Sequence, residues 1–229
     1  MYKQKYNYQK LSRVEKDGVR RYRLDGTDVD PVPSVTTILD ALKDKTHLYE
    51  WRKRVGNEEA DRISRISAGL GTAVHLNLEK HILEEDRPSG TNLVHQMAKG
   101  LADIVIDEGL SNVDEFWGVE VPLYCPELYA GTTDCVGIWK GKEAIIDFKT
   151  TKKPKKREWI EDYFCQGAAY ATAHNEVFGT NIRTIVIMMI AWDEGYEGVY
   201  QEFVIEGEEF DKYQIEWLTK VQEYYSKFG

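Results

Sequence analysis

The sequence predicts an α/β fold, with a mixed β-sheet flanked by helices and a helical N-terminal part. The apolar residues of the first half recur mainly at helical spacing, after a short hairpin pattern. After residue 110 the pattern changes to short apolar runs typical of strands, in the order strand, hairpin, helix, strand, strand, helix. Because no linker-like or repeated segment interrupts 1–229, we expect one domain. Residues 1–110 would hold the hairpin and helices, and 111–229 the α/β core.

A β-hairpin is expected first. The apolar runs Tyr8–Val14 and Val19–Leu24 flank the dipeptide Asp17-Gly18, which favours a tight turn. Prolines break the chain near residue 31, and Ser34 or Thr36 can cap a helix that runs to about Leu42.

Helices are expected over most of the next seventy residues. Helical spacing covers His47 to about Leu83 and again Leu93–Glu108. Gly56 and the pair Gly69 and Gly71 are expected to interrupt the first of these stretches, because glycine is a poor helix former.

The second half is expected to supply the sheet. Lys140 to Glu143 should form the turn of a hairpin between two of its strands. The expected strands are Phe116–Tyr124, Thr132–Trp139, Ala144–Thr150, Arg183–Trp192 and Gly198–Ile205, and the expected helices are Glu158–Phe178 and Glu208–Phe228.

Charge and cysteine content limit the classes of function. The formal net charge of -9 argues against a protein that binds nucleic acid by charge alone. The three cysteines fit no zinc or disulfide framework, which favours reduced thiols and a cytoplasmic location, or the host cytoplasm if the source is viral. The polar N-terminus is unlike a signal or transit peptide, and the longest apolar run is too short for a membrane span.

The triplet Asp147-Phe148-Lys149 follows an apolar run typical of a buried strand. Because side chains alternate along a strand, Asp147 and Lys149 should project from one face and Phe148 from the other. Such a pair can be a structural ion pair. It can also be half of a hydrolytic site, in which the carboxylate binds a hard cation and the lysine orients or deprotonates a water.

Asp134 lies on the strand expected to pair with that of Asp147. A lone strand aspartate is usually a surface residue. Two neighbouring carboxylates, however, repel each other unless a proton or cation lies between them. Asp134, Asp147 and Lys149 together therefore indicate a candidate cation site.

His75 and Glu79 lie one turn apart on a predicted helix. A lone helical histidine is more often a packing residue than a metal ligand. Glu79 can orient an imidazole, but we interpret it as a solvated charge.

Gln166 and Tyr170 are also one turn apart, with the small residues 167–169 between them. This spacing indicates a tight helix–sheet contact, and it also allows both side chains to hydrogen-bond a phosphate or catalytic groups. Directly after the Asp-Phe-Lys strand comes a basic segment whose five cations are usually solvated, but which lies where a phosphate backbone would pass. They are Lys152, Lys153, Lys155, Lys156 and Arg157.

Four short motifs in order resemble the RecB-like branch of the PD-(D/E)XK nuclease superfamily, which has a restriction-endonuclease-like fold. Each motif alone is weak, and the ordered series is more specific. The motifs are Gly71-xxx-His75, Gly131-xx-Asp134, Asp147-x-Lys149 and Gln166-xxx-Tyr170. Upstream, Arg21-Tyr22, the segment 33–39 and Trp51-xxxx-Gly56 resemble the leader of phage and mitochondrial exonucleases of this branch.

The resemblance implies roles for these residues. His75, Asp134, Asp147 and the Phe148 carbonyl would bind Mg²⁺ or Mn²⁺, and Lys149 would position the attacking water. Gln166 and Tyr170 would support the substrate or the site. Ser34 and Thr36 would contact DNA phosphates, the N-terminal helices would arch over a single strand, and Glu120 is either an additional acidic group or an outward strand residue.

Iron–sulfur members of the branch use four cysteines around the core. Cys125, Cys135 and Cys165 do not match them, so no cluster is expected. The resulting prediction is a metal-dependent DNA exonuclease that prefers single strands or DNA ends, with a single-strand-binding or recombination protein as a possible partner. Its expected setting is DNA processing, recombination or degradation. The alternatives are a structure-specific or sequence-specific endonuclease of the same superfamily and a non-catalytic DNA-binding recombination protein.

Overall fold

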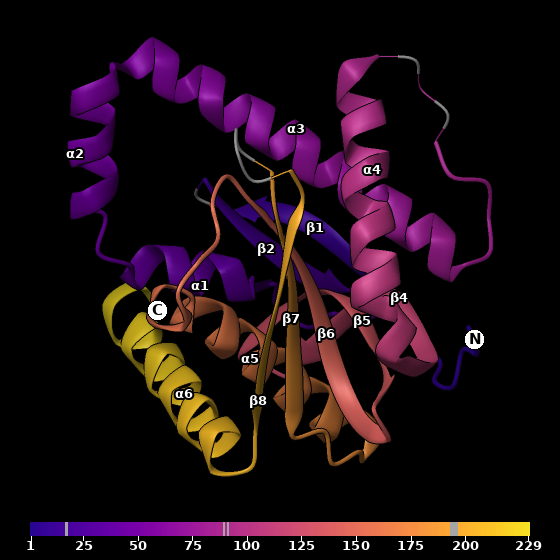
Figure 1. The fold of residues 1–229 in the computed structure, drawn as a ribbon. Coiled ribbons are helices and arrows are strands. Elements are labelled where there is room, and N and C mark those ends of the chain that lie inside the picture. The colour runs from indigo at the N-terminus through magenta and orange to yellow at the C-terminus, as the bar shows by residue number, and fades with distance from the viewer. Residues whose placement is uncertain (17, 89, 91, 193–196) are drawn as a thin grey trace.

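The central element of the computed structural model is a five-stranded sheet in the order β4-β5-β6-β7-β8. The structure describes residues 1–16, 18–88, 90, 92–192 and 197–229 (Figure 1). The strands span Val113–Cys125 (β4), Tyr129–Trp139 (β5), Lys142–Thr151 (β6), Thr184–Ala191 (β7) and Val199–Glu206 (β8).

This sheet is mixed. β6 and β7 are parallel, with Ile146 beside Val186, and the other neighbouring pairs are antiparallel. The parallel pair requires a crossover, and α5 (Glu161–Phe178) supplies it after the 3₁₀ turn η2 (Arg157–Trp159). The mixed sheet with flanking helices confirms the predicted fold class.

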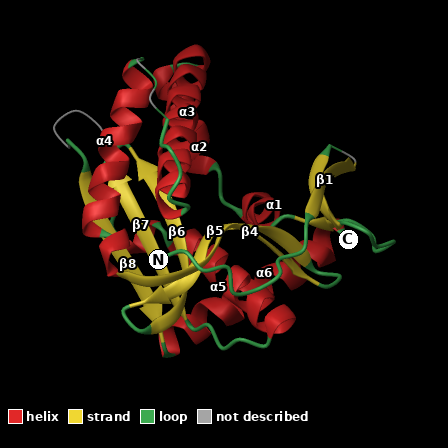
Figure 2. Ribbon diagram, turned by 90° about the vertical axis from the view of Figure 1, so that its right-hand side faces the viewer, coloured by secondary structure: helices red, strands yellow, loops and turns green. Residues whose placement is uncertain are grey.

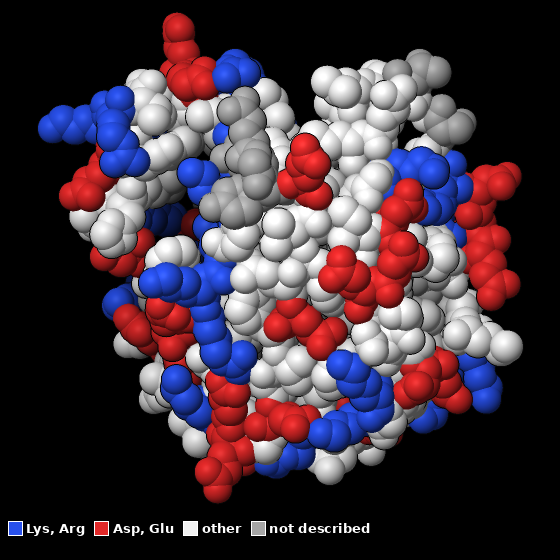
Figure 3. All heavy atoms as spheres, in the orientation of Figure 1, with Lys and Arg blue, Asp and Glu red and all other residues white. Residues whose placement is uncertain are grey.

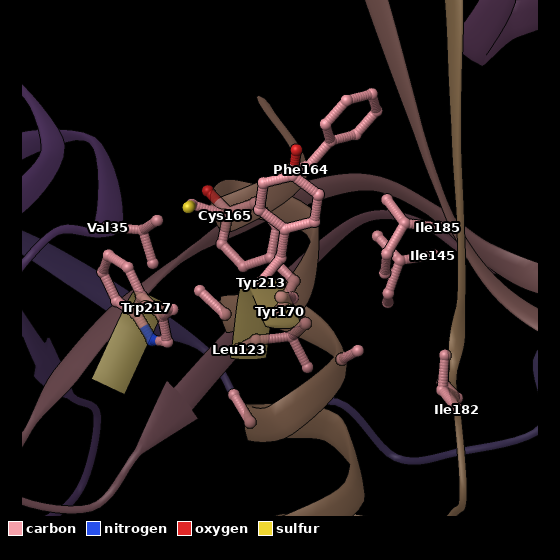
Figure 4. Close-up of a cluster of buried hydrophobic side chains, with 14 of the residues drawn as sticks. Val35, Leu123, Ile145, Phe164, Cys165, Tyr170, Ile182, Ile185, Tyr213 and Trp217 are labelled. Carbon is pink, nitrogen blue, oxygen red and sulfur yellow. The ribbon is translucent and has the colours of Figure 1, made fainter. Parts of the chain in front are cut away.

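Two layers of helices cover the sheet (Figure 2). On one face α3 (Asn57–Ile82) and α4 (Leu93–Glu108) bury Leu70, Val74 and Leu101 against Ile146 and other sheet residues. The opposite face is covered by α1 (Val35–Leu42), α5 and α6 (Glu208–Phe228). Figure 4 shows this second core, with Val35 of α1, Trp217 of α6 and Tyr170 of α5 around Leu123 of β4. The sheet is therefore buried on both faces.

The N-terminal hairpin forms a small second sheet, as predicted. β1 (Leu11–Lys16) pairs with β2 (Val19–Leu24), and the short β3 (Val32–Pro33) adds to β2. Asp17 of the predicted turn lies outside the described residues. Ser34 caps α1, because its hydroxyl accepts the N–H of Thr37 at 2.9 Å.

One predicted helix break is wrong. Gly56 does separate α2 (Thr46–Val55) from α3 (Asn57–Ile82), but α3 continues through Gly69 and Gly71. Interior glycines cost only about 1 kcal/mol each in a helix, and the buried face of α3 offsets this cost. Gly71 also has a packing reason, because a Cβ there would lie 3.0 Å from the Thr150 hydroxyl of β6.

α2 and the first half of α3 project from the body of the molecule as an arch (Figure 1). α2 has no buried residue, and Arg52, Lys53 and Arg54 form its last turn. In Figure 3 the surface is hollowed between this arch and the sheet, and Lys and Arg side chains line part of the hollow. Among the described residues, no helix is both long and apolar enough to cross a membrane.

Candidate active site

Asp134 lies where β5 and β6 separate. The ladder between the two strands ends at the pair Cys135 and Ile146. Beyond this pair the Asp134 carboxylate takes the place of a backbone partner, because its Oδ2 accepts the N–H of Phe148 at 2.6 Å. In an antiparallel pair a residue directs its N–H and C=O to the same neighbour. The Phe148 carbonyl is therefore directed to the same gap as the Asp134 carboxylate.

Asp147 and Lys149 project from β6 on the face opposite to Phe148, as the alternation predicts. Asp147 is 3% exposed, and its Oδ2 contacts the Nζ of Lys149. Phe148 packs with α3 and α4 in the other core. The Lys149 Nζ also lies 5.0 Å from the ring centroid of Tyr163 at the start of α5.

Three possible metal ligands from three different elements meet at Asp134. His75 of α3 places its Nδ1 3.2 Å from the Asp134 Oδ1. Glu120 of β4 lies between Val119 and Val121, which pair with the residues on either side of Asp134, so it faces Asp134 across the strands. Each of the three offers one ligand atom within 4.8 Å of the others.

The backbone of β4 is irregular at Glu120. Its φ is 49°, which is unusual for a residue with a Cβ. The site therefore keeps Glu120 in a strained conformation next to another carboxylate. The sequence left two alternatives open, an additional acidic group and an outward strand residue; Glu120 is exposed and also faces Asp134, so both descriptions stay open.

The electrostatics of the site are those of crowded carboxylates. Burial, together with the charge of Asp134, raises the pKa of Asp147 to about 6, although Lys149 opposes this shift. Loss of hydration and the charge of Asp134 raise the pKa of Glu120 to about 7. Without a cation, some of these carboxylates hold protons near neutral pH.

His75 and Lys149 respond to the same negative charge. Burial alone would lower the pKa of His75, but its hydrogen bond with Asp134 and the charge of Asp134 together outweigh burial and raise the pKa above its usual value. The pKa of Lys149 is likewise raised, because Asp147 and Asp134 together outweigh its burial. Burial alone would raise the pKa of Asp134, but the hydrogen bond and charge of His75, the charge of Lys149 and the Phe148 N–H together lower it.

The donor set fits a hard divalent cation. Two carboxylates and an imidazole converge on one point. Asp147 is outside this group of three, but it is near enough for its charge to influence Glu120 and for that of Asp134 to influence it. Carboxylate and carbonyl oxygens are the ligands that Mg²⁺ and Mn²⁺ prefer. A cation between Glu120 and Asp134 would remove the repulsion that now raises the pKa of Glu120.

Gln166 and Tyr170 contact each other on α5, as the spacing suggested. The Gln166 amide donates to the Tyr170 hydroxyl at 3.3 Å, and Tyr170 is buried. Gly131 of β5 makes room for this ring, because a Cβ there would lie 2.9 Å from Tyr170 Cε1. Asp147 and Lys149 influence the pKa of Tyr170, which burial raises, so the ring lies near the site.

The predicted DNA contacts lie in two places. Ser34 is buried and bonded to the Arg20 guanidinium at 3.1 Å, while Thr36 is exposed beside it. In the basic segment, Arg157 is engaged internally, with its Nη2 2.6 Å from Glu209 and 2.8 Å from the Val204 carbonyl.

The four lysines of the basic segment make no carboxylate ion pair among the described residues, and Lys153 and Lys156 are exposed. They are Lys152, Lys153, Lys155 and Lys156. Glu59 of the arch has its pKa lowered by a hydrogen bond from Arg62 and, to a smaller extent, by the charge of Lys152. Lys152, at the start of the basic segment, is therefore near Glu59 of the arch.

Sequence reasoning missed two neighbours of the site, Tyr163 and Arg20, and interpreted a third, Glu79, as a solvated charge. Glu79 lines an open hollow with Glu120 and His75, and its charge adds to the raised pKa of Glu120. Its helical spacing from His75 was the available signal. Nothing in the sequence pointed to Tyr163 beneath Lys149, or to Arg20 beside Ser34.

Comparison with known proteins extends this description. The chain is 27% identical over 226 residues to mitochondrial genome maintenance exonuclease 1 of Xenopus tropicalis, which covers 91% of this chain and 60% of that protein. It is 32% identical over 207 residues to the Mus musculus protein of the same name, covering 86% and 60%. The chain resembles the mitochondrial genome maintenance exonucleases.

The chain spans about 60% of the length of these two mitochondrial genome maintenance exonucleases. The Homo sapiens protein aligns over 105 residues at 32% identity, covering 43% of this chain and 29% of that protein. No family model matches the chain. A crystal structure of a candidate exonuclease from Eubacterium rectale superposes with a TM-score of 0.49 and 11% identity, over 69% of this chain and 65% of that one.

Proposed function

We propose that this chain is a metal-dependent DNA exonuclease that hydrolyses phosphodiester bonds, with a preference for single strands or DNA ends. The observation that carries the proposal is the meeting of His75, Glu120 and Asp134 beside the Asp147–Lys149 pair. The names of the mitochondrial relatives support the same activity. Residues 1–229 would act as one nuclease domain.

The residues that would hold Mg²⁺ or Mn²⁺ are His75, Asp134, Asp147 and the Phe148 carbonyl, with Glu120 as an additional acidic group. When bound, such an ion lowers the pKa of a water and neutralises charge on a phosphoryl oxygen. The protein's own contribution is to hold these donors from α3, β4, β5 and β6 in one place before substrate arrives.

Lys149 would orient the attacking water and stabilise charge on the phosphate. Asp147 and Asp134 raise its pKa, so the side chain is an ammonium at neutral pH. A positively charged donor in a partly enclosed site stabilises the extra negative charge of the transition state. Gln166 and Tyr170 would support the site near Lys149. The Gln166 amide already donates a hydrogen bond to the Tyr170 hydroxyl.

The arch is the feature that favours the proposed preference for single-stranded DNA. The charge of Lys152 influences Glu59 of the arch, and the surface beside the arch is hollowed (Figure 3). Lys53 and Arg54 of α2 make no ion pair with any described residue. Ser34 and Thr36 would add phosphate contacts. Because these groups address the backbone, we expect indifference to base identity.

We further propose DNA processing, recombination or degradation as its setting. The cofactor would be Mg²⁺ or Mn²⁺, without an iron–sulfur cluster, and a partner could be a single-strand-binding or recombination protein. Cys125, Cys135 and Cys165 are buried free thiols, which is compatible with a reducing compartment such as the cytoplasm.

The test is digestion of end-labelled DNA with Mn²⁺, Mg²⁺ or EDTA. Linear single strands blocked at one end or the other, linear duplexes and circular single strands are compared. We expect metal-dependent release of short products from linear single strands and none from circles. Asp147→Asn should abolish release and should still bind DNA.

Cleavage of circles would instead support the endonuclease alternative. If neither form is cleaved while DNA is bound, the non-catalytic alternative holds. If DNA is neither cleaved nor bound with either metal, the proposed function is wrong.

A further inference from the structure

Trp159 is the most exposed tryptophan among the described residues. It is 62% exposed and ends the 3₁₀ turn η2 between the basic segment and α5. Trp117, Trp139 and Trp217 are buried, and Trp51 and Trp192 are half-buried. Trp159 belongs to none of the three hydrophobic clusters of the described residues. Its indole therefore does little for the core of the protein.

The backbone around Trp159 is nevertheless fixed. The Trp159 N–H donates to the Lys156 carbonyl at 3.0 Å, and the next residue, Ile160, is 1% exposed. At the start of the turn, the Arg157 guanidinium is bound by the carboxylate of Glu209 at 2.6 Å. An exposed aromatic ring on a fixed backbone loses little conformational freedom on binding.

The chemistry around the ring alternates between cations and aromatic groups. The Lys156 Nζ lies 5.3 Å from the Trp159 ring centroid, and the Lys152 Nζ lies 5.4 Å from that of Trp192. Proteins that bind single strands without sequence preference combine a positive track for the phosphates with aromatic faces for the bases. The segment from Lys152 to Trp159 has both features.

Trp159 is also close to the candidate active site. The Tyr163 N–H donates to the Ile160 carbonyl at 2.9 Å, which starts the first turn of α5. The Tyr163 ring in turn lies 5.0 Å from the Lys149 Nζ. Tyr163 follows Trp159 by four positions, which is about 6 Å at the rise of a helix. A base on Trp159 would therefore belong to a nucleotide close to the bond that is cut.

We infer that Trp159 stacks on a nucleobase of a single strand beside the candidate active site, while Lys156 contacts the adjacent phosphate. This inference rests on the proposed function. Stacking tolerates any base, but it requires a base to be present. The enzyme would therefore be insensitive to sequence and sensitive to a missing base at one position.

The test measures binding of oligothymidylates that carry one abasic site, moved along the chain, to protein with Asp147→Asn so that no cleavage occurs. With Trp159 present, one abasic position should weaken binding about 10-fold, within the range that a single stacked base contributes. Trp159→Leu should weaken binding of the intact oligonucleotide by a similar factor. In this variant an abasic site at that position should no longer weaken binding. Trp159→Phe should retain most of the effect.

Two further measurements separate stacking from a structural role. Indole fluorescence should fall on binding and should fall less in Trp159→Leu. Phe228→Ala removes an exposed ring of α6 that is 53% exposed, and it should change neither quantity. If Trp159→Leu retains the abasic penalty, or weakens all oligonucleotides equally, the inference is overturned. Failure of the unmodified chain to bind or cut any DNA would instead reject the proposed function.

Discussion

The Asp134 carboxylate accepts the backbone N–H of Phe148 at 2.6 Å, where the β5–β6 ladder would otherwise continue. One side chain thus satisfies a strand donor and also contacts His75. Because a side chain and not the backbone of β5 accepts this N–H, the two strands stay apart here. The Phe148 carbonyl is directed into the resulting opening.

Replacement of Asp134 should therefore affect stability as well as metal binding. Asp134→Ala leaves the Phe148 N–H without its partner, so we expect a loss of about 1–3 kcal/mol in the free energy of unfolding without metal. Asp134→Asn keeps an acceptor and should lose less. Both should abolish the rise in Tm that Mn²⁺ causes. Denaturant titration in EDTA measures the first effect and thermal shift the second.

Asp114 provides a matched control, because its carboxylate also accepts a backbone N–H, that of Gly141 at 2.7 Å, but at an exposed position. Asp114→Ala should cost less than Asp134→Ala. Equal costs would show that the Asp134–Phe148 bond does not support the sheet.

The stability of the protein should depend on pH in opposite directions with and without metal. The pKa values of Asp147 and Glu120 are raised to about 6 and about 7, so each carboxylate destabilises the metal-free fold as pH rises through these values. The raised pKa of His75 acts in the same direction, because its pairing with Asp134 is lost as the imidazole loses its proton.

Cation binding requires these groups to be unprotonated, so the increase in Tm with Mn²⁺ should grow from pH 6 to pH 8. In EDTA the two carboxylates should lower the Tm as pH rises through about 6 and about 7, and their effect should level off above pH 7. Glu120→Gln should flatten the EDTA profile near pH 7 relative to unmodified protein. An unchanged profile would mean that Glu120 does not titrate in this range.

Lys149 should contribute to catalysis and not to metal binding. Lys149→Met should lower the turnover of single-stranded DNA by on the order of 10²–10³, the effect of removing one stabilising donor. Its loss also leaves Asp147 without its cation, so the assay is best run near pH 8.5, where that carboxylate is ionised. The rise in Tm with Mn²⁺ should persist there. The control is Lys10→Met, a replacement at an exposed residue of the N-terminal segment. A loss below tenfold in Lys149→Met would contradict this role.

Two glycine replacements should change stability in opposite directions. Gly167 of α5 packs on β7, and a Cβ there would lie 2.2 Å from Ile185 Cγ2. Gly167→Ala should therefore lower the free energy of unfolding by about 1–3 kcal/mol through overpacking. Gly69 of α3 has no atom within 4 Å of such a Cβ, and Gly69→Ala should raise it by about 0.5–1 kcal/mol. Denaturant unfolding of both variants tests the packing, and a destabilised Gly69→Ala would contradict it.

The lysines of the basic segment should set the salt dependence of DNA binding. Lys153→Ala and Lys156→Ala should each reduce the slope of log affinity against log salt by about 0.7, the value for one phosphate contact on a single strand. Lys10→Ala, on the N-terminal segment, should leave the slope unchanged. Arg157→Ala should mainly lower stability, because its guanidinium binds Glu209 and the Val204 carbonyl. Equal slopes for all four variants would place the strand elsewhere.

Most elements of the fold could be predicted from local sequence. The α4 and α6 bounds agree with the expectation, because apolar periodicity marks both helices and Asn92 and Gly109 cap the two ends of α4. The interruption expected at Gly69 and Gly71 was wrong, since the cost of an interior glycine is small compared with the buried face of a long helix. Contact with Thr150 of β6 explains Gly71, and such a contact between distant segments is invisible in local propensity.

The site was predictable where spacing along one element fixes geometry. Alternation placed Asp147 and Lys149 together, and helical spacing placed Gln166 beside Tyr170. Neither rule could show that Glu120 faces Asp134, because this depends on the register between β4 and β5. The same holds for His75, whose approach depends on how α3 packs across the sheet.

Because α3 is continuous, one helix both forms half of the arch and carries His75 to the site. From Gly56 at the corner of the arch to His75 at the site it covers 19 residues, or about 28 Å at 1.5 Å per residue. Each residue inserted or removed upstream of Gly69 would turn the arch by roughly 100° around the helix axis and leave His75 in place. The number of residues in this part of α3 therefore sets the direction in which the arch points. A change of seven residues, close to two full turns, would alter that direction least.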